Sequence, residues 1–294
     1  MASGHTMNTT VRPIRAEDVE VCGRIGFNAH QQVAAKHGFP PEQPSIEFAT
    51  GLIKAKVSDP NAWGAVAERD GQVVGSIFLN LFPPASIAAI GPLTVDPSGQ
   101  GGTGERLMEA ALDEAQRRGI ERVRLVQSPS HPRSLALYVK MGFDVREPLL
   151  LMQGKPPPPD ASARSAVRAA TAQDIVACGE LCTRAHGFVR ELELSTAVAQ
   201  GHASVVEADG RIGGYAAGIG FRGHAVAESD AHLWALIAHA PAFLGPGFFF
   251  PARNTDLLRR LLQAGLRIGW PATLMTMGPY LEEPEVAYLP SIAY

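Results

Sequence analysis

Apolar and polar residues alternate along this chain with a helical period in some stretches and as short apolar runs in others. The clearest helical pattern spans 104–119, where four apolar residues share one face and charged residues occupy the other. The four are Leu107, Ala111, Leu112 and Ala115. Gly119 follows two arginines and marks the end of this helix. The stretch therefore predicts an amphipathic helix.

The same reading of the first half predicts strands and helices in a mixed order. The expected strands are 11–14, 63–68, 73–82, 88–95, 123–127 and 149–153, and the expected helices are 19–37, 45–56, 104–119 and 134–141. This order predicts an α+β domain with a mixed, mostly antiparallel sheet flanked by helices.

A proline-rich stretch divides the chain near its middle. Four consecutive prolines within 155–164 favour an extended polyproline conformation and cannot join a core helix or a sheet, so we interpret the stretch as a linker. It separates a domain at 11–154 from a domain at 165–294. Residues 1–10 are expected to form a flexible leader.

The two halves repeat one another in sequence. Val11, Arg12, Asp18, Cys22, Gly23 and His30 recur 156 positions later as Val167, Arg168, Asp174, Cys178, Gly179 and His186. Val66, Glu68, Asp70, Gly71 and Gly75 recur 139 positions later as Val205, Glu207, Asp209, Gly210 and Gly214, each Asp-Gly being a hairpin signal. Gly142 and Pro148 pair with Gly265 and Pro271. Because the order is kept, we infer a duplicated domain.

A glycine-rich turn joins the strand that ends at Val95 to the helix 104–119. Gly99, Gly101, Gly102 and Gly104 offer no side chains to bury, so we interpret them as clearing space for a ligand. A helix N-terminus presents backbone N–H groups and the positive end of its dipole, which predicts an anion site, most plausibly for a diphosphate.

Two common nucleotide-binding motifs do not fit this turn. A P-loop needs Lys and Ser or Thr after its last glycine, but Glu105 and Arg106 follow here. A dinucleotide fingerprint needs an acidic residue about 20 residues further on, and the stretch 122–126 does not end in one. Neither class of site is therefore predicted.

A second motif lies downstream at 131–143, reading His-Pro-Arg-Ser-Leu-Ala-Leu-Tyr-Val-Lys-Met-Gly-Phe. Together with the glycine turn it resembles the GNAT superfamily of N-acetyltransferases. The resemblance implies two GNAT-like domains in tandem, with acetyl-CoA as co-substrate and no metal. It places the pyrophosphate on the amides of Gln100, Gly101, Gly102, Thr103, Gly104 and Glu105, and pantetheine beside Leu93, Thr94 and Val95.

The resemblance also implies roles for residues of the second motif. Tyr138 matches the tyrosine beside the cofactor sulfur and is the expected general acid, with Ser134 and His131 at the cofactor. His131 stands where the family often has Asn. The glycine loop also departs from the family pattern and can be aligned in two ways. Either Gln100 takes the family's Gln/Arg position in a loop one residue shorter, or Gly99 takes the first position and the family's Gln or Arg is lost. Alternatively, Tyr138 packs as a core aromatic with Leu137 and Phe143.

The general base is left open by the sequence. The candidates are Asp96, Glu47, His30 and His37, for each of which turn chemistry or a solvated helix face is an alternative role. Acyl transfer to an amine needs such a group, directly or through water, because an alkyl ammonium has a pKa near 10.

The second half lacks the chemistry of the first. The stretch 224–234 has no glycines, Leu261 stands at the place of Tyr138, and Leu257 replaces Ser134, so this copy is not expected to bind CoA. The second copy is expected to pack against the first and to line one side of the acceptor cleft. The candidate contributors to this side of the cleft are Arg253, Asn254, Tyr280 and Tyr288. Their alternative role is structural, as a helix cap or as polar residues on strands.

Composition narrows the function classes. The 294 residues carry a net charge of −3 and no apolar run of membrane-spanning length, which excludes a nucleic-acid footprint and predicts a cytoplasmic protein without a membrane partner.

Cys178, Cys182 and His186 share a helical face, but we interpret them as core residues rather than metal ligands. The expected function is N-acetylation of a primary amine by a monomer or homodimer. The alternative function is that of a non-catalytic sensor that binds an acyl-CoA or another small molecule.

Overall fold

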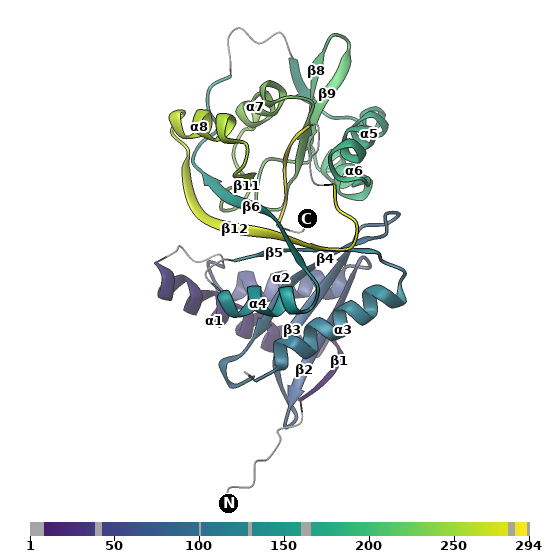
Figure 1. The fold of residues 1–294 in the computed structure, drawn as a ribbon, viewed down its shortest axis with the longest axis vertical. Helices are drawn as coiled ribbons and strands as arrows, with labels where there is room; N and C mark the ends of the chain where they lie inside the picture. Colours follow the sequence, from purple (N-terminus) through teal and green to yellow (C-terminus); the bar gives the residue numbers. More distant parts are fainter. Residues whose placement is uncertain are drawn as a thin grey trace, which may run out of the picture. The chain divides into compact units, whose positions relative to one another are not determined.

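The computed structural model describes residues 9–38, 43–99, 101–128, 131–159, 166–281 and 286–292. They form two compact units, one ending at Val123 and one beginning at Arg124 (Figure 1). Each unit has buried apolar residues of its own, around Val66 and Phe78 in the first and around Leu233 and Phe250 in the second. The predicted boundary at 155–164 stays a prediction, and 160–165 lie outside the described residues.

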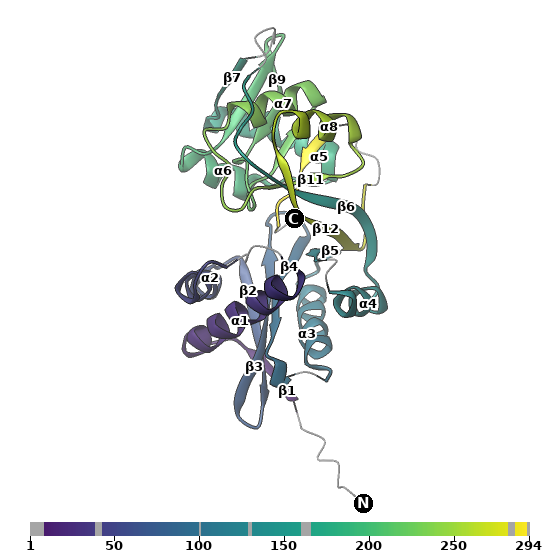
Figure 2. The same cartoon turned by 90° about the vertical axis from the view of Figure 1, so that its left-hand side faces the viewer.

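The first unit is an antiparallel sheet between helices. Its elements are β1 (Thr9–Pro13), α1 (Val19–His37), α2 (Ile46–Ser58), β2 (Ala62–Arg69), β3 (Gln72–Leu81), β4 (Ile87–Val95) and α3 (Thr103–Arg117), followed by β5 (Arg122–Gln127), which crosses into the second unit. β1, β2, β3 and β4 pair in that order, each antiparallel to the next. α1 and α2 cover one face of this sheet and α3 the other (Figure 2). The predicted α+β class is confirmed.

The second unit continues the chain through two sets of paired strands. Its elements are α4 (Pro132–Lys140), β6 (Asp144–Gln153), β7 (Ala166–Ala169), α5 (Ile175–His186), α6 (Glu191–Ala199), β8 (Ser204–Ala208), β9 (Arg211–Ala216), β10 (Ala225–Ala227), α7 (Asp230–His239), β11 (Phe248–Pro251), α8 (Thr255–Gln263), β12 (Arg267–Met277) and β13 (Ala287–Leu289). From β7 to β12 the order of helices and strands repeats that from β1 to β6. The predicted duplication is visible in this order.

The hairpins of the two copies turn in the same way. Asp70 and Gly71 connect β2 to β3 with φ values of 51° and 76°, and Asp209 and Gly210 connect β8 to β9 with 52° and 75°. Two consecutive positive φ values define the hairpin turn that matches the twist of the flanking strands, and Asp-Gly is the usual sequence for it. The Asp-Gly signal in the sequence therefore correctly predicted both turns.

A buried ion pair fixes the start of each copy. Arg12 binds both Asp18 and Glu68, and the pairing that the repeat predicts recurs, with Arg168 binding Asp174 and Glu207. Both aspartates also accept a backbone N–H three residues earlier, at 2.7 Å, and so cap a short 3-10 turn. The shared sequence positions thus perform the same structural task twice.

The strand exchange in the second unit was not foreseen from the sequence. β6, the last strand of the first repeat, pairs antiparallel with both β11 and β12 of the second repeat. β6 is also longer than the predicted strand 149–153, because its first half from Asp144 pairs with the end of β12. The first repeat therefore completes a sheet of the second.

A further strand, β13, pairs with β10 in the other sheet of this unit. That sheet runs in the order β13, β10, β9, β8, β7, with antiparallel neighbours throughout. β10 corresponds to β4 of the first copy. One edge of β10 is consequently occupied by backbone hydrogen bonds from β13.

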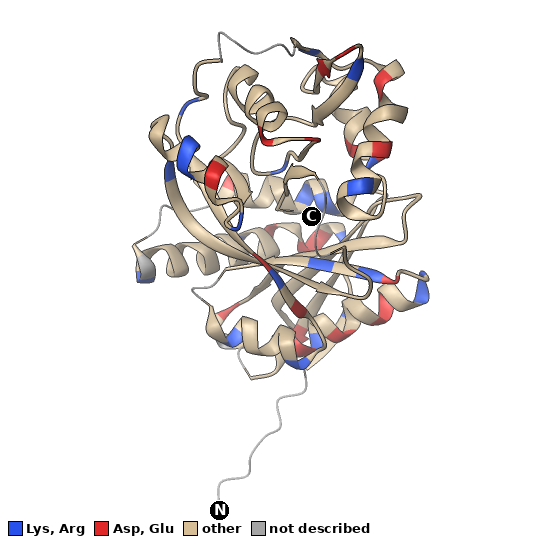
Figure 3. Cartoon of the chain, turned by 45° about the horizontal axis from the view of Figure 1, so that its top comes forward, with Lys and Arg blue, Asp and Glu red and all other residues tan. Residues whose placement is uncertain are grey.

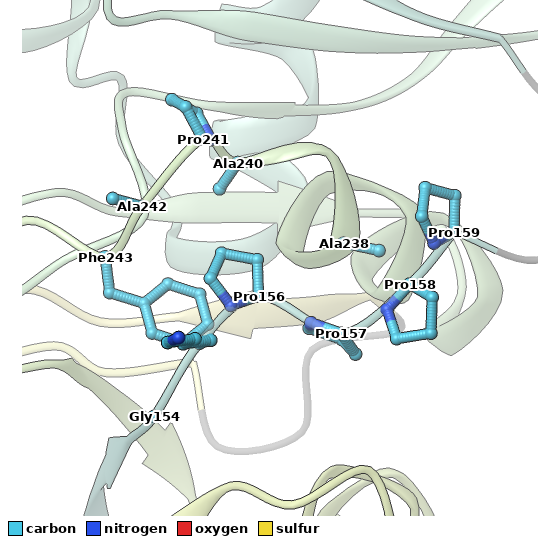
Figure 4. Close-up of a pocket in the computed structure, with 11 residues that line it drawn as sticks. Gly154, Pro156, Pro157, Pro158, Pro159, Ala238, Ala240, Pro241, Ala242 and Phe243 are labelled. Carbon is cyan, nitrogen blue, oxygen red and sulfur yellow. The ribbon is translucent and has the colours of Figure 1, made fainter.

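The prolines of the predicted linker lie against the end of α7. Pro156, Pro157, Pro158 and Pro159 run past Ala238 and Phe243 in an extended course (Figure 4). Together they border a surface hollow of about 650 Å³. This course fits the polyproline conformation expected of consecutive prolines, which has no internal hydrogen bonds.

Candidate functional site

The turn between β4 and α3 is held by two backbone hydrogen bonds, one to β3 and one within the turn. The Asp96 N–H donates to the Val74 carbonyl at 2.8 Å, and the Gly99 N–H donates to the Asp96 carbonyl at 2.8 Å. α3 then begins with Gly102 as its N-cap, which has no side chain to accept from the first turn of the helix. A helix start that is left uncapped in this way offers its N–H groups to an anion.

The glycines of this turn have different reasons to be glycine. A Cβ on Gly99 would lie 2.8 Å from the Val74 carbonyl oxygen, so Gly99 lets the turn pack closely against β3. This corrects the expectation that all the glycines clear space for a ligand. Gly101 and Gly102 have φ values of 99° and 93°, and a Cβ on either would meet nothing within 4 Å. Their contribution is the backbone conformation and an open surface.

An arginine that the sequence analysis missed holds the two ends of the turn. Arg69, at the end of β2 and 8% exposed, donates to the Gly99 carbonyl at 3.2 Å and to the Thr103 hydroxyl at 3.1 Å. The Thr103 hydroxyl in turn donates to the Gly99 carbonyl. The repeat contained a signal for this residue, because Arg69 aligns with Ala208 in the copy that has no glycine turn.

The strand expected to bind pantetheine carries an irregularity before the expected residues. The register between β3 and β4 shifts around Gly91 and Pro92, after which Leu93 pairs with Ile77 and Val95 with Gly75. Asn80 donates its side-chain amide to the carbonyls of Ala89 and Gly91, at 2.9 and 2.8 Å. Such a bulge re-aims the strand that follows it.

The side chain of Asn80 is itself held in place. Its oxygen accepts a hydrogen bond from Lys56 of α2. Further along β4, Thr94 is buried and its hydroxyl lies 3.3 Å from that of Ser76. The first contact joins α2 to β3, and the second joins β3 to β4.

The second motif forms α4 in the other compact unit. His131 is the exposed N-cap of α4 and makes no side-chain cap, while Pro132 occupies the first turn. Burial raises the pKa of Tyr138 to about 12, an effect that a hydrogen bond with Ser134 partly offsets. The phenol is therefore protonated throughout the physiological pH range.

Tyr138 also has a packing role. Its ring lies 6.2 Å from that of Phe143, centroid to centroid, at an interplanar angle of 59°. The chain turns back after α4 through Gly142, whose φ is 95°, and the Phe143 N–H donates to the Tyr138 carbonyl at 3.0 Å. The contact with Phe143 that the core alternative expected is present, and a role in chemistry stays a prediction.

The structure places the candidate bases in different surroundings. Glu47 is exposed in the first turn of α2, where a hydrogen bond with Ser45 lowers the pKa of its carboxyl group. His30 Nδ1 lies 2.8 Å from the Gly26 carbonyl one turn earlier in α1. Asp96 begins the glycine turn, and its backbone N–H donates to the Val74 carbonyl. Gln100 and the side chain of His37 lie outside the described residues.

The cysteine and histidine face in the second copy is part of the core. Cys178, Cys182 and His186 are all buried in α5, and burial raises the thiol pKa of Cys178 to about 12. His186 packs edge-on against Tyr288 at 5.1 Å between ring centroids. In the part of the chain that the structure describes, no group of three metal-ligating side chains is found.

All four candidate wall residues make contacts within the second unit. Arg253 donates twice to the Glu147 carboxylate, at 2.8 and 2.6 Å. The Tyr280 ring lies 5.3 Å from the guanidinium of Arg124 and 5.1 Å from that of Arg146. Arg146, Arg253 and Tyr280 border one polar hollow of about 230 Å³.

Asn254 caps a helix, as its alternative role expected. Its side chain accepts from the Leu257 N–H at 3.3 Å at the start of α8 and donates to Asp230 at 2.7 Å. Leu257 and Leu261, which replace Ser134 and Tyr138, are buried in the core on the same helix. α8 therefore has the place of α4 in the repeat but presents apolar residues there.

The second copy also differs where the first has its glycine turn. Only Glu228 and Ser229 separate β10 from α7, and the Ser229 side chain accepts from the His232 N–H at 3.2 Å. This helix start is capped by its own serine, whereas that of α3 is not. The capped helix start leaves this copy without the uncapped N–H groups of the first site.

Charges are mixed over the surface of the chain. Figure 3 shows acidic and basic residues interspersed along the helices. Within the described residues, no helix has the length and apolar character to cross a bilayer.

The α+β fold is built twice, and the first copy has a glycine turn at an uncapped helix start, an arrangement that favours an anion. The model of the acetyltransferase (GNAT) family matches residues 17–143. Mycothiol acetyltransferase of Beutenbergia cavernae is 38% identical over 87 residues, which is 29% of this chain and 29% of that protein. The matched stretch thus spans under a third of that relative's length.

Two solved structures match nearly the whole chain. One is a proposed acetyltransferase of Pyrococcus horikoshii, with a TM-score of 0.71, 19% identity and coverage of 95% of this chain and 92% of that one. The other is a GCN5-related N-acetyltransferase of Sphaerobacter thermophilus, with a TM-score of 0.60, 15% identity and coverage of 94% and 98%. These two show the fold. Residues 17–143 thus match the GNAT acetyltransferase family, and the chain as a whole has the tandem GNAT-like fold of these two structures.

Proposed function

We propose that this protein transfers an acetyl group from acetyl-CoA to the primary amine of a small molecule. The observation that carries the proposal is the glycine turn at the uncapped start of α3, which lies inside the stretch matched by the family. An uncapped helix start with two open, positive-φ glycines suits a pyrophosphate, because both the N–H groups and the helix dipole favour negative charge.

The residues that would hold acetyl-CoA fit it chemically. Gly101 and Gly102 are exposed, and the space where a Cβ would stand on either of them is open, so the backbone there is accessible to a ligand. Leu93–Val95 would supply strand backbone for the amides of pantetheine. When bound, acetyl-CoA supplies the acyl group as a thioester, whose thiol leaving group has a pKa near 8.5.

The protein's own groups would manage the protons of this transfer. A C–N bond forms and the C–S bond breaks. The ammonium of the acceptor gives up two protons, one to a base or to water before attack and one as the amide forms, and the sulfur takes one. We propose Tyr138 as the general acid at the sulfur, because burial keeps its phenol protonated. With a pKa above that of the thiol, the phenol acts first as a hydrogen-bond donor to the sulfur as negative charge develops there.

The proposal also assigns a role to each copy, the domain bounds and the assembly. We propose that the first copy binds the cofactor and that the second shapes the acceptor side, with Arg253 and Tyr280 as contributors because they border one polar hollow. The domains are proposed at 11–154 and 165–294, in a cytoplasmic monomer or homodimer that binds neither nucleic acid nor membrane. No metal is proposed for the reaction.

A ligand-binding assay and a turnover assay together test this function. We expect acetyl-CoA and CoA to raise the melting temperature at concentrations above the dissociation constant. We also expect free thiol to be released with at least one member of a panel of primary amines. Binding of acetyl-CoA without thiol release would favour a non-catalytic sensor. The absence of both would rule out the transferase.

A further inference from the structure

Arg69 connects three parts of the first copy that are far apart in sequence. Its side chain donates to the Thr9 hydroxyl in β1 at 3.2 Å, as well as to the Gly99 carbonyl and the Thr103 hydroxyl at the two ends of the glycine turn. A charged donor in a buried position is costly unless its hydrogen bonds are made, so this conformation of the turn is favoured over alternatives that lack them.

The contacts of Arg69 determine the shape of the turn rather than its chemistry. They hold Gly99 and Thr103 on the protein side, whereas a Cβ on Gly101 or Gly102 would meet open space. Gly101 and Gly102 give this turn unusual backbone freedom, because glycine loses more entropy on ordering than any other residue. A fixed anchor at both ends reduces that freedom before a ligand arrives.

The duplicated copy supplies an internal comparison. The sequence Glu68-Arg69-Asp70-Gly71 becomes Glu207-Ala208-Asp209-Gly210, with the same hairpin turn and the same glutamate bound by an arginine of the first strand. Only the arginine is lost. The hairpin and the ion pair therefore form without it.

What the second copy lacks, besides this arginine, is the glycine turn itself. β10 leads into α7 through two residues, whereas seven residues separate β4 from α3. The arginine is thus present in the copy with the turn and absent from the copy without it. This co-occurrence points to a role for Arg69 in the turn, in addition to its contact with Thr9 of β1.

We propose that Arg69 is a positioning residue that pre-orders the amides of the glycine turn for the pyrophosphate of CoA. The inference rests on the proposed function for the identity of the ligand. The role of Arg69 in ordering the turn stands on the contacts alone. It acts through Gly99 and Thr103 and is not proposed to touch the reacting atoms.

The test compares Arg69→Met with Arg69→Lys and with Arg12→Met. Met keeps the apolar stem of Arg69 without its donors, and Lys restores a charge but not the forked geometry. Arg12 is the matched control, because it is an arginine of the neighbouring strand β1 whose guanidinium binds Asp18 and Glu68. The readouts are the dissociation constant for CoA by calorimetry and hydrogen exchange of the amides of 101–106 without ligand.

We expect Arg69→Met to weaken CoA binding roughly tenfold or more and to speed exchange at 101–106. Arg69→Lys should recover part of both, and Arg12→Met should change neither despite lowering stability. Exchange and affinity in Arg69→Met that match those in Arg12→Met would overturn the inference. If the unmodified protein does not bind CoA, the proposed function fails, and exchange at 101–106 still decides whether Arg69 orders the turn.

Discussion

Arg12 binds Asp18 through two nearly parallel hydrogen bonds, of 2.8 and 2.9 Å, and this two-point ion pair is reproduced in the second copy. The two-point geometry is the strong form of a carboxylate–guanidinium contact. Asp18 is buried, so its charge is compensated by hydrogen bonds rather than by water. The duplication has preserved this contact although the two sequences have diverged around it.

The stability of the protein should fall in mild acid because of these aspartates. The Arg12 guanidinium lowers the pKa of Asp18, and Arg168 lowers that of Asp174, so both are lower in the folded chain than in the unfolded one. A lowered folded pKa stabilises the fold above the unfolded value of about 3.9, and the stabilisation is lost as the pH falls below it. Denaturant unfolding at pH 7, 5 and 3 would measure this.

Asp18→Asn identifies the contribution of one pair. We expect it to lower the free energy of unfolding by about 2 kcal/mol at pH 7, because the Arg12 guanidinium then keeps only Glu68 as a charged partner, and by less at pH 3. Asp256→Asn is the control, since Asp256 is 91% exposed in its pair with Arg259 and should change little. An equal loss at both pH values would contradict the assignment.

Replacing Tyr138 by Phe should separate its chemical role from its packing role. Phe retains the contact with Phe143 and removes only the hydroxyl, so we expect kcat to fall on the order of tenfold or more and CoA affinity to be preserved. Because the pKa of Tyr138 is about 12, the unmodified protein should show no alkaline loss of rate from this residue below about pH 11. A kcat close to normal would leave Tyr138 as a packing residue.

Two alanine substitutions in the glycine turn should differ in their effect. Gly99→Ala places a Cβ 2.8 Å from a backbone oxygen of β3, so the turn must shift, and we expect a loss of about 2 kcal/mol of stability together with weaker CoA binding. Gly101→Ala meets no atom but keeps an unfavourable φ of 99°, so we expect a smaller loss, about 1 kcal/mol. Thermal unfolding with and without CoA measures both. The reverse order would show that β3 does not limit this turn.

The three cysteines should be unreactive in the native protein. All are buried, and burial raises the thiol pKa of Cys22 to about 11 and that of Cys178 to about 12. A thiol reagent at pH 8 should therefore titrate none of them until denaturant is added, when all three should react. This result would also mean that free thiol in the turnover assay comes from CoA. A native reactivity of one thiol or more would contradict the burial.

Asn80→Ala should disturb β4 beyond its immediate neighbours. It leaves the carbonyls of Ala89 and Gly91 without the side-chain donor, and we expect about 2 kcal/mol of lost stability and a higher KM for acetyl-CoA. Asn254→Ala, which removes a helix cap in the second copy, is the matched control and should cost about 1 kcal/mol without changing KM. Equal KM effects in the two variants would remove the link between the bulge and the cofactor.

Local patterns in the sequence were enough for the helices, the hairpins and the duplication. The predicted helix 19–37 coincides with α1, and the glycine turn lies where the strand-to-helix junction was expected. These features depend on residues close in sequence, whose periodicity and turn chemistry act on the backbone directly. The candidate site residues of the turn were named for the same reason and stay a prediction.

Contacts between distant residues were decided only by the tertiary structure. Nothing in the apolar pattern of β6 states that it pairs with β11 and β12, since a strand's period shows which face is buried but not which strand is its neighbour. Arg69 likewise reads as an ordinary charged residue before a hairpin, and its position against Gly99 depends on how β2 and the turn pack. The sequence by itself thus determined the two copies and their elements, while packing between elements decided the strand exchange, the edge taken by β13 and the anchor of the glycine turn.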